Sequence, residues 1–321
     1  MSETLLFNNI KKIPPEDYYT AGHRTCAGCG PALAYRLVAK AAGPNTIFIG
    51  PTGCMYVANA HQFLTSPYAV PWYHTQLGGG GAAAIGTAAA LKALMDKGKR
   101  KMEDVNVIVF GGDGAMADIG LSGLSMGLSY NYKRLLYIVY DNESYANTGI
   151  QASSTTPWGA TTTFTPEGRV NRIGNERLKK NMALIAAAHP GVKYVATATL
   201  HPPLDLMNKV VKGLNAGGPS LVHVLLPCPK GWFSEPSDTV QLGKLAVETG
   251  MWALWEYSDG NFKLNYKPNP RKHVKEYLKL QGRFSHLDPE DFDKIDKMVE
   301  EEWPYWEESN KRGKIVLPYE K

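Results

Sequence analysis

The four cysteines of this chain all lie in turns that are rich in glycine or proline. Cys26 and Cys29 belong to the segment CAGCG, Cys54 ends the segment TGC, and Cys228 lies between two prolines. Structural cysteines usually pack inside apolar elements as small hydrophobic residues, whereas turns of this kind let the backbone wrap around an inorganic centre. Four thiolates can hold one metal ion or one cubane iron–sulfur cluster. The pattern therefore favours a cofactor site.

Other interpretations of the cysteines stay open. Disulfides are not expected, because the N-terminus MSETLLFNNIKKIPPEDYY lacks the pattern of a signal peptide and cytoplasmic thiols stay reduced. Four unrelated free cysteines are one alternative, and structural zinc is a stronger one. Zinc sites favour two close cysteine pairs, whereas here one close pair is joined by two distant single cysteines. That spacing fits a cluster somewhat better than zinc and does not decide between them.

A second group of polar residues follows two apolar segments, 106–110 and 135–140. Asp113 lies in GGDGAMAD after the first segment, and Asn142 lies in DNES after the second. If the segments are neighbouring parallel strands, their carboxyl ends share the crevice where such sheets bind ligands. A carboxylate, an amide oxygen and a nearby carbonyl suit Mg²⁺, and the glycines allow a helix N-terminus to approach a pyrophosphate.

The Gly-Asp-Gly triplet alone is also ordinary turn chemistry. The whole order of strand, Gly-Asp-Gly, helix, strand and Asn is far more specific, and it resembles the pyrophosphate-binding domain of thiamin-diphosphate-dependent enzymes. Neither a P-loop nor a G-x-G-x-x-G pattern follows a suitable strand in this chain.

The elements that would position these residues alternate along the chain. Continuous apolar runs of this kind are typical of strands buried on both faces, and helical segments separate them. The alternation predicts an α/β fold with a mostly parallel sheet and helices on both faces. The expected strands are 46–50, 106–110, 135–140, 193–198 and 221–226, and helices are expected at 31–42 and 82–96.

Composition limits the remaining possibilities. The 321 residues, 44% of them hydrophobic, can form one large α/β domain or two smaller ones. No apolar run is long enough to span a membrane, and the net charge of +5 comes from scattered Lys and Arg rather than a nucleic-acid-binding stripe. We expect a cofactor-binding domain at 1–235 and a C-terminal extension at 236–321. The aromatic residues Trp303, Tyr305 and Trp306 of this extension are expected to dock on a neighbouring subunit.

Together these features resemble the β subunit of the pyruvate:ferredoxin oxidoreductases, within the 2-oxoacid:ferredoxin oxidoreductase family. The resemblance extends from about Gly22 to about Phe284, and its segments follow the family's order. The segments that carry it are GHRTCAGCG, TGCMYV, PWYH, GGDGAMADIG, YDNESYANTGIQ, SSTTP, PCPKGW and EYLKLQGRF.

The resemblance implies roles for individual residues. The thiolates that match ligands of a single [4Fe-4S] cluster are those of Cys26, Cys29, Cys54 and Cys228. The Mg²⁺ ligands would be Asp113, the side chain of Asn142 and the backbone carbonyl of Ser144. The expected catalytic residues are Thr52 and Asn147. The expected cofactor-binding residues are Thr52, Gly53, Gly112, Asp113, Gly114, Ala115, Asn142, Ser144, Asn147 and Thr148.

The resemblance also implies a reaction, namely coenzyme A-dependent oxidative decarboxylation of pyruvate to acetyl-CoA and CO₂, with electrons passing to ferredoxin. The glutamate that activates thiamin would come from a partner α subunit. Further clusters would lie on γ and ferredoxin-like δ subunits or on fusions of them. The isolated chain is therefore expected to be inactive, and the complex is expected to be cytoplasmic.

One segment departs from the family's pattern. After Trp72-Tyr73-His74, many pyruvate-type relatives carry an acidic residue followed by Asn, where this chain has TQLGGGG at 75–81. The departure is either a harmless loop variant or an adaptation to another 2-oxoacid, such as oxalate or an aryl-2-oxoacid. A non-redox thiamin enzyme with structural zinc is the remaining alternative.

Overall fold

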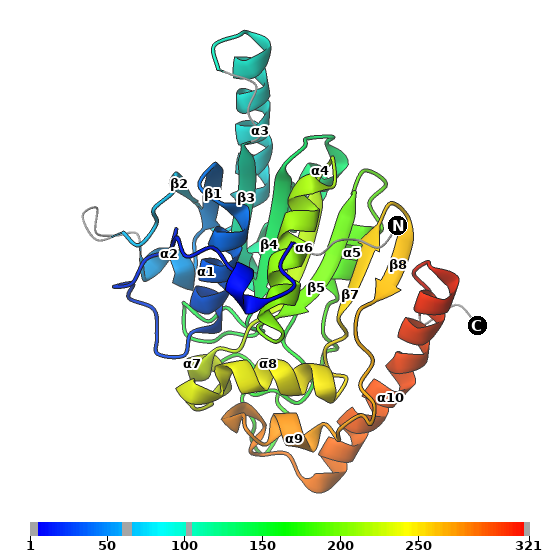
Figure 1. Ribbon diagram of the computed structural model, residues 1–321. Helices are drawn as coiled ribbons and strands as arrows, with labels where there is room; N and C mark the ends of the chain where they lie inside the picture. Colours follow the sequence, from blue (N-terminus) through cyan, green and yellow to red (C-terminus); the bar gives the residue numbers. More distant parts are fainter. Residues whose placement is uncertain (1–5, 60–65, 101–104, 318–321) are drawn as a thin grey trace.

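The computed structural model describes residues 6–59, 66–100 and 105–317. Within these residues, the strands form one sheet of order β2-β1-β3-β4-β6-β5-β7-β8 (Figure 1). The strands from β2 to β5 in this order run parallel, and β7 and β8 are antiparallel at one edge. Their bounds are β1 (Thr46–Pro51), β2 (Trp72–Thr75), β3 (Asn106–Gly112), β4 (Leu135–Asp141), β5 (Tyr194–Thr199), β6 (Ser220–Leu225), β7 (Trp255–Ser258) and β8 (Asn261–Leu264).

Helices cover both faces of the sheet (Figure 1). Because successive side chains of a strand point to opposite faces, Phe48 and Ile108 pack with α1 and α6, whereas Ile49 and Val107 pack in the core formed with α3, α4 and α5. The helices are α1 (Gly30–Ala42), α2 (Cys54–Val57), α3 (Gly80–Asp96), α4 (Leu121–Ser129), α5 (Met182–Ala187), α6 (Pro203–Asn215), α7 (Pro229–Trp232), α8 (Thr239–Glu248), α9 (Lys275–Leu278) and α10 (Pro289–Arg312). The predicted fold class is confirmed.

Each predicted strand and helix is present, with bounds that differ by a few residues. Three short strands were not predicted. β2 is only partly buried and lacks a continuous apolar run. β7 and β8 form a hairpin whose turn residues, Asp259 and Gly260, have φ angles of 47° and 84°. An Asp-Gly pair between alternating segments is a recognised hairpin signal, so the sequence did carry this information.

The C-terminal residues complete the same sheet instead of leaving it. β7 pairs with β5, and α10 packs against β8 (Figure 1). Trp306 lies against Trp255 and Phe262, with ring centroids 6.0 and 6.1 Å apart.

The prediction that these indoles dock on a neighbouring subunit is wrong, because the chain itself buries them. Trp303 and Trp306 are 7% and 5% exposed, and the indole of Trp303 donates a hydrogen bond to the carbonyl of Gly250. A docking role for the rest of 236–321 stays a prediction. Among the described residues, no helix is both long and apolar enough to cross a membrane.

Candidate active site

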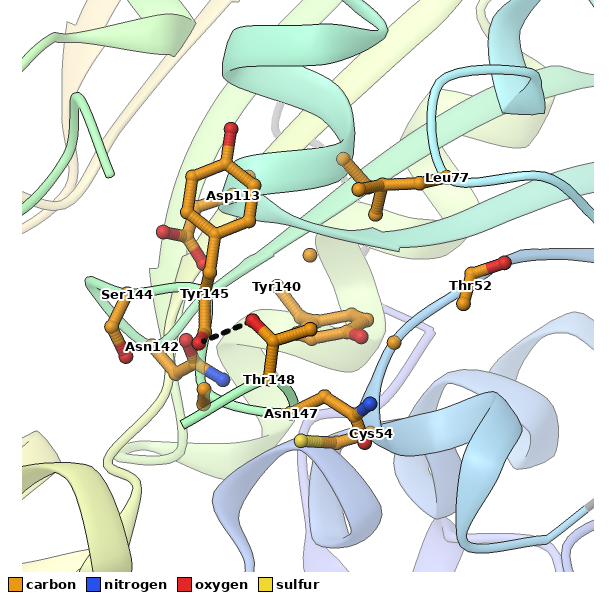
Figure 2. Close-up of a pocket in the computed structure, with 15 residues that line it drawn as sticks. Thr52, Cys54, Leu77, Asp113, Tyr140, Asn142, Ser144, Tyr145, Asn147 and Thr148 are labelled. Atoms are coloured by element: carbon orange, nitrogen blue, oxygen red, sulfur yellow. Dashed lines mark hydrogen bonds between the residues drawn. The ribbon is translucent and has the colours of Figure 1, made fainter. Parts of the chain in front are cut away.

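A pocket opens at the carboxyl ends of β1, β3 and β4, where the turns after these strands meet (Figure 2). It contains about 460 Å³ of empty space, its open mouth included. All of the predicted cofactor-binding residues line it, which brings together three segments far apart in the sequence. The lining consists of Thr52, Gly53, Cys54, Leu77, Gly112, Asp113, Gly114, Ala115, Tyr140, Asn142, Ser144, Tyr145, Ala146, Asn147 and Thr148.

The predicted Mg²⁺ ligands meet at one point of the pocket wall. One terminal atom of the Asn142 amide lies 2.8 Å from the carbonyl oxygen of Ser144 and 3.1 Å from Oδ1 of Asp113. If that atom is nitrogen, it donates to both oxygens; if it is oxygen, three oxygens converge with no donor between them. The second arrangement is the one that a hard cation requires. The three predicted ligands therefore lie next to one another in the pocket wall, and their role in binding Mg²⁺ stays a prediction.

Asp113 lies at the base of this wall and is almost completely buried. The hydroxyl of Thr155 lies 2.9 Å from Oδ2 of Asp113 and 2.9 Å from Oδ1 of Asp141. Burial, together with the charge of Asp141, raises the pKa of Asp113 to about 8. A cation bound beside a buried carboxylate stabilises its charged form. The local electrostatics thus fit a metal ion.

The loop after β4 holds the remaining predicted residues at the pocket mouth. It contains two residues other than glycine with positive φ, Glu143 at 64° and Ile150 at 63°. A bridge between Tyr145 and Gln151 closes it, with the amide of Tyr145 donating to the carbonyl of Gln151 at 2.9 Å. Positive φ is costly for side chains of these types, β-branched Ile above all. The surrounding structure therefore holds Asn147 in a constrained loop.

Two glycines allow the pocket walls to approach one another. A Cβ atom on Gly53 would lie 2.7 Å from the hydroxyl of Tyr140, and one on Gly114 would lie 2.4 Å from the ring of Tyr145. Gly114 begins a π-helical turn, Gly114–Ile119, directly after Asp113. The backbone at both positions can thus come close to a ligand in the pocket.

Of the four cysteines, Cys54 lines this pocket and the charges of the other three act on it, and none of the four forms a disulfide. Cys29 caps α1 and Cys228 caps α7, and the amide of Gly30 donates to the carbonyl of Pro227 at 3.2 Å. Cys54 begins α2 and also lines the pocket. The thiol of Cys228 accepts a hydrogen bond from the amide of Gly231 at 3.3 Å. Three helix starts thus present thiols to one region.

The thiols also influence one another electrostatically. Burial, followed by the charges of Cys228, Cys29 and Cys26, raises the pKa of Cys54 to about 12. Burial and the charges of Cys228 and Cys26 likewise raise the pKa of Cys29 to about 12. In the described part of the chain, no group of three or more His, Cys, Asp and Glu side chains is arranged to hold a single metal ion. The thiolates around a cubane each bind a different iron atom and so stand further apart than ligands of one ion.

Comparison with known proteins decides the family. Residues 51–224 match the model of the thiamine pyrophosphate enzyme, C-terminal TPP binding domain. The chain is 47% identical over 298 residues to pyruvate synthase subunit PorB of Methanocaldococcus jannaschii, covering 91% of this chain and 97% of that protein. This chain belongs to the thiamin-diphosphate-binding subunits of the 2-oxoacid:ferredoxin oxidoreductases. The family predicted from the motifs is confirmed.

Two further similarities concern substrate and fold. The chain is 42% identical over 301 residues to ketoisovalerate oxidoreductase subunit VorB of Pyrococcus furiosus, covering 92% of this chain and 95% of that protein. A solved 2-oxoglutarate:ferredoxin oxidoreductase from Magnetococcus marinus aligns with a TM-score of 0.54 and 22% identity, over 71% of this chain and 79% of that one. The latter shows that the fold is shared.

The glycines that depart from the family pattern have a packing explanation. A Cβ atom on Gly80 would lie 2.6 Å from the ring of Pro51, and one on Gly81 would lie 2.3 Å from the backbone of Gly123. The first turn of α3 is therefore pressed against β1 and α4 and has no room for side chains. The neighbouring Leu77 faces the pocket instead, opposite Asn142 and Ser144 in Figure 2. Whether this changes substrate choice stays a prediction.

Sequence reasoning missed a largely buried group of charged residues behind the pocket of this oxidoreductase subunit. Lys179 donates to Asp141 at 2.6 Å and to Glu143 at 2.9 Å, and His223 lies 2.9 Å from Asp141. Burial alone would raise the pKa of Asp141, but the charge of Lys179 and the hydrogen bond to His223 outweigh it and hold the pKa below its usual range. Arg283 forms an ion pair with Glu143. Asp141 and Glu143 are close in the sequence, but Lys179, His223 and Arg283 lie far from them, so no local pattern predicts these contacts.

Two uncharged pocket residues that were not predicted lie beside a motif that the sequence does show. Tyr140 and Tyr145 flank the DNES segment that was singled out, and both line the pocket. Their rings fill the space that Gly53 and Gly114 leave open. The signal for both residues is thus their position directly beside the proposed ligand segment.

Proposed function

We propose that this subunit binds thiamin diphosphate through Mg²⁺ next to a [4Fe-4S] cluster and serves in the oxidative decarboxylation of pyruvate. The observation that carries the proposal is the position of the Thr52-Gly53-Cys54 turn. These residues line the pocket, and Cys54 is at the same time one of four neighbouring thiols. One short turn would thus contact both cofactors.

The pocket wall supports the Mg²⁺ part of the proposal. With the amide oxygen of Asn142 turned toward them, Asp113, Asn142 and the carbonyl of Ser144 would offer three oxygens around one point. The hydroxyl of Ser144, which is buried without a hydrogen-bond partner among the described residues, lies beside Gly231 on the side of Cys228 and is not one of the proposed ligands. Mg²⁺ is usually held by one or two carboxylates plus phosphate oxygens, so the diphosphate would complete the coordination.

The chemistry of a 2-oxoacid oxidoreductase suits these neighbours. When bound, thiamin diphosphate supplies a nucleophilic carbon for decarboxylation, and a cluster accepts single electrons. In our proposal the chain holds the diphosphate through the metal ligands and the amides that follow Asp113. Asn147 and Thr52 stand at the open side, where they would contact the substrate, and Leu77 would keep that side apolar.

Pyruvate is the proposed substrate because the methanogen relative with 47% identity is named pyruvate synthase. In Pyrococcus furiosus, a relative named pyruvate synthase is 41% identical and the one named ketoisovalerate oxidoreductase is 42% identical. Overall identity therefore separates the two substrates only weakly, which makes 3-methyl-2-oxobutanoate the most informative competitor.

The proposed complex contains an α subunit that supplies the thiamin-activating glutamate, together with γ and ferredoxin-like δ subunits or fusions of them. Ferredoxin and coenzyme A are the proposed co-substrates. The chain has only four cysteines, so further clusters would have to be carried by such partners.

The test is anaerobic reduction of ferredoxin or a viologen dye by the intact complex, with coenzyme A and one 2-oxoacid at a time. We expect the highest kcat/KM with pyruvate, lower values with 3-methyl-2-oxobutanoate, oxalate and phenylglyoxylate, and none with the isolated chain. A higher kcat/KM for another oxoacid would show that this oxoacid, and not pyruvate, is the preferred substrate. Activity of the isolated chain would contradict the proposed need for an α subunit.

A further inference from the structure

We propose that Glu143 is a positioning residue that holds the metal-ligand loop in a strained conformation. Its buried carboxylate is held by Lys179 and Arg283, and we call these three residues the Glu143 clamp. The inference rests on the proposed function, because the ligands it positions are those proposed for Mg²⁺. It assigns a role to a side chain that faces away from the pocket.

The backbone of Glu143 is what brings its two neighbours together. With φ at 64°, it reverses the chain between Asn142 and Ser144, so that the side chain of one and the carbonyl of the other face the same point. The amide of Glu143 donates to Oδ1 of Asp141 at 2.9 Å. Its carbonyl accepts a hydrogen bond from the hydroxyl of Thr156 at 2.7 Å. Both backbone groups are thus fixed in the left-handed conformation.

That conformation is unfavourable for a glutamate and persists only when its surroundings enforce it. An ordinary extended or helical φ at this position would turn the carbonyl of Ser144 away from Asn142. The local hydrogen bonds to Asp141 and Thr156 contribute to the enforcement. These two hydrogen bonds involve only the backbone of Glu143. They do not explain why its carboxylate is buried.

Both oxygens of that carboxylate are held by cations. Oε1 accepts from Lys179 at 2.9 Å, and Oε2 forms an ion pair with Arg283, whose side chain is 3% exposed. Gln281 accepts from the same guanidinium at 2.7 Å. The guanidinium also lies 4.1 Å from the ring centre of Trp232. A buried carboxylate with charged partners on both oxygens can be moved only by leaving one of them unpaired.

The clamp therefore fixes the side chain of Glu143, and through it the positive φ of the Glu143 backbone. Arg283 belongs to the C-terminal residues of the chain, and Lys179 lies near the end of the long segment between β4 and α5. Two distant parts of the sequence thus converge on the one residue between two proposed metal ligands. Packing alone would not require a buried guanidinium and a partly buried ammonium on one carboxylate, whereas precise placement of Asn142 and Ser144 would.

The test measures Mn²⁺ binding by the full-length chain in the presence of thiamin diphosphate, using the electron paramagnetic resonance signal of free Mn²⁺. The variants are Glu143→Ala and Glu143→Gly, together with the double variant Glu143→Gln/Arg283→Gln, which preserves the net buried charge. Glu256→Gln is the matched control, because Glu256 is also buried and accepts from Lys212 and Tyr194 but lies outside the pocket. Circular dichroism and thermal melting report folding.

We expect about 10- to 100-fold weaker Mn²⁺ binding for Glu143→Ala and for the double variant, as for other residues that orient metal ligands. Glu143→Gly should recover part of the loss, because glycine adopts positive φ without strain. Glu256→Gln should melt at a lower temperature and bind Mn²⁺ as the wild type does.

Two results would overturn the inference while leaving the proposed function intact. One is wild-type Mn²⁺ affinity in a folded Glu143→Ala chain. The other is an equal loss in the Ala and Gly variants, since the effect would then not depend on backbone strain. A wild-type chain that binds no Mn²⁺ with thiamin diphosphate would overturn the proposed function and, with it, the inference.

Discussion

The indole nitrogen of Trp232 donates a hydrogen bond to the backbone carbonyl of Asn142 at 2.9 Å. Trp232 ends the short helix that Cys228 caps, and Asn142 is a proposed Mg²⁺ ligand. The loop of one cysteine is therefore tied directly to the loop that would hold the metal ion. This contact complements the Thr52-Gly53-Cys54 turn, which lines the pocket from another segment of the chain.

Replacing Trp232 with Phe should destabilise the protein and disturb the metal site together. The Asn142 carbonyl would lose its buried donor, which costs about 1–3 kcal/mol in the free energy of unfolding. We expect thiamin diphosphate to bind more weakly in the presence of Mg²⁺, measured by titration calorimetry alongside urea denaturation.

Trp303→Phe provides the matched control for this change. Its indole, in α10, also donates to a backbone carbonyl, that of Gly250 at 3.1 Å, but in the C-terminal part of the chain. It should lose a similar amount of stability and bind the cofactor normally. Normal cofactor binding by Trp232→Phe as well would contradict the proposed coupling of the two loops.

The contact between Gly53 and Tyr140 predicts that a substitution at one residue can be compensated by a substitution at the other. A methyl group on Gly53 would lie 2.7 Å from the Tyr140 hydroxyl but 4.0 Å from the ring carbon that bears it. Gly53→Ala should therefore destabilise the chain by about 1–3 kcal/mol through overpacking. Adding Tyr140→Phe should restore most of that loss, as measured by urea denaturation of the single and double variants. Failure of the second change to help would show that the turn needs glycine for another reason.

Helix α10 should be released by acid, because a carboxylate near its start anchors it. Asp296 accepts from both terminal nitrogens of Arg271, at 2.8 and 2.7 Å, and from the amide of Val274 at 2.9 Å. Burial acts to raise the pKa of Asp296, but these hydrogen bonds outweigh it and hold the pKa below the ordinary value.

Since the folded pKa lies below the unfolded one, the stabilisation is complete above about pH 4 and is lost as the pH falls through the folded value. Asp296→Asn should cost about 1–3 kcal/mol at pH 7 and flatten the fall of melting temperature below pH 4. Glu300→Gln is the control, because Glu300 contacts the same Arg271 from an exposed position. It should change stability by less than about 1 kcal/mol. Equal effects of the two variants at pH 7 would contradict the anchoring role of Asp296.

The central strands and the pocket could be predicted because their signals are local. Continuous apolar runs mark β3 and β4, and Asp113 and Asn142 follow those runs directly. Parallel pairing of neighbouring strands then places both residues in one crevice. The hairpin of β7 and β8, which was not among the predicted strands, has a local signal too, in Asp259 and Gly260.

The parts that could not be predicted depend on contacts between distant residues. Glu143 and Arg283 are 140 positions apart, and neither stands in a recognisable charge pattern. The burial of Trp306 against Trp255 depends on where α10 returns to the sheet, which no periodicity specifies. The sequence therefore indicated the ligands of the site but not the residues that hold them in place.

The most direct test of the central claim is the inorganic content of the anaerobically purified chain. Iron, acid-labile sulfide and zinc would be measured on one sample, with the visible spectrum before and after dithionite, and with Cys54→Ser as comparison. Our account predicts about four iron and four sulfide per chain and a visible absorption that bleaches on reduction. The Cys54→Ser variant should lose the iron, the sulfide and the absorption. A colourless wild-type chain with about one zinc and no sulfide would contradict it.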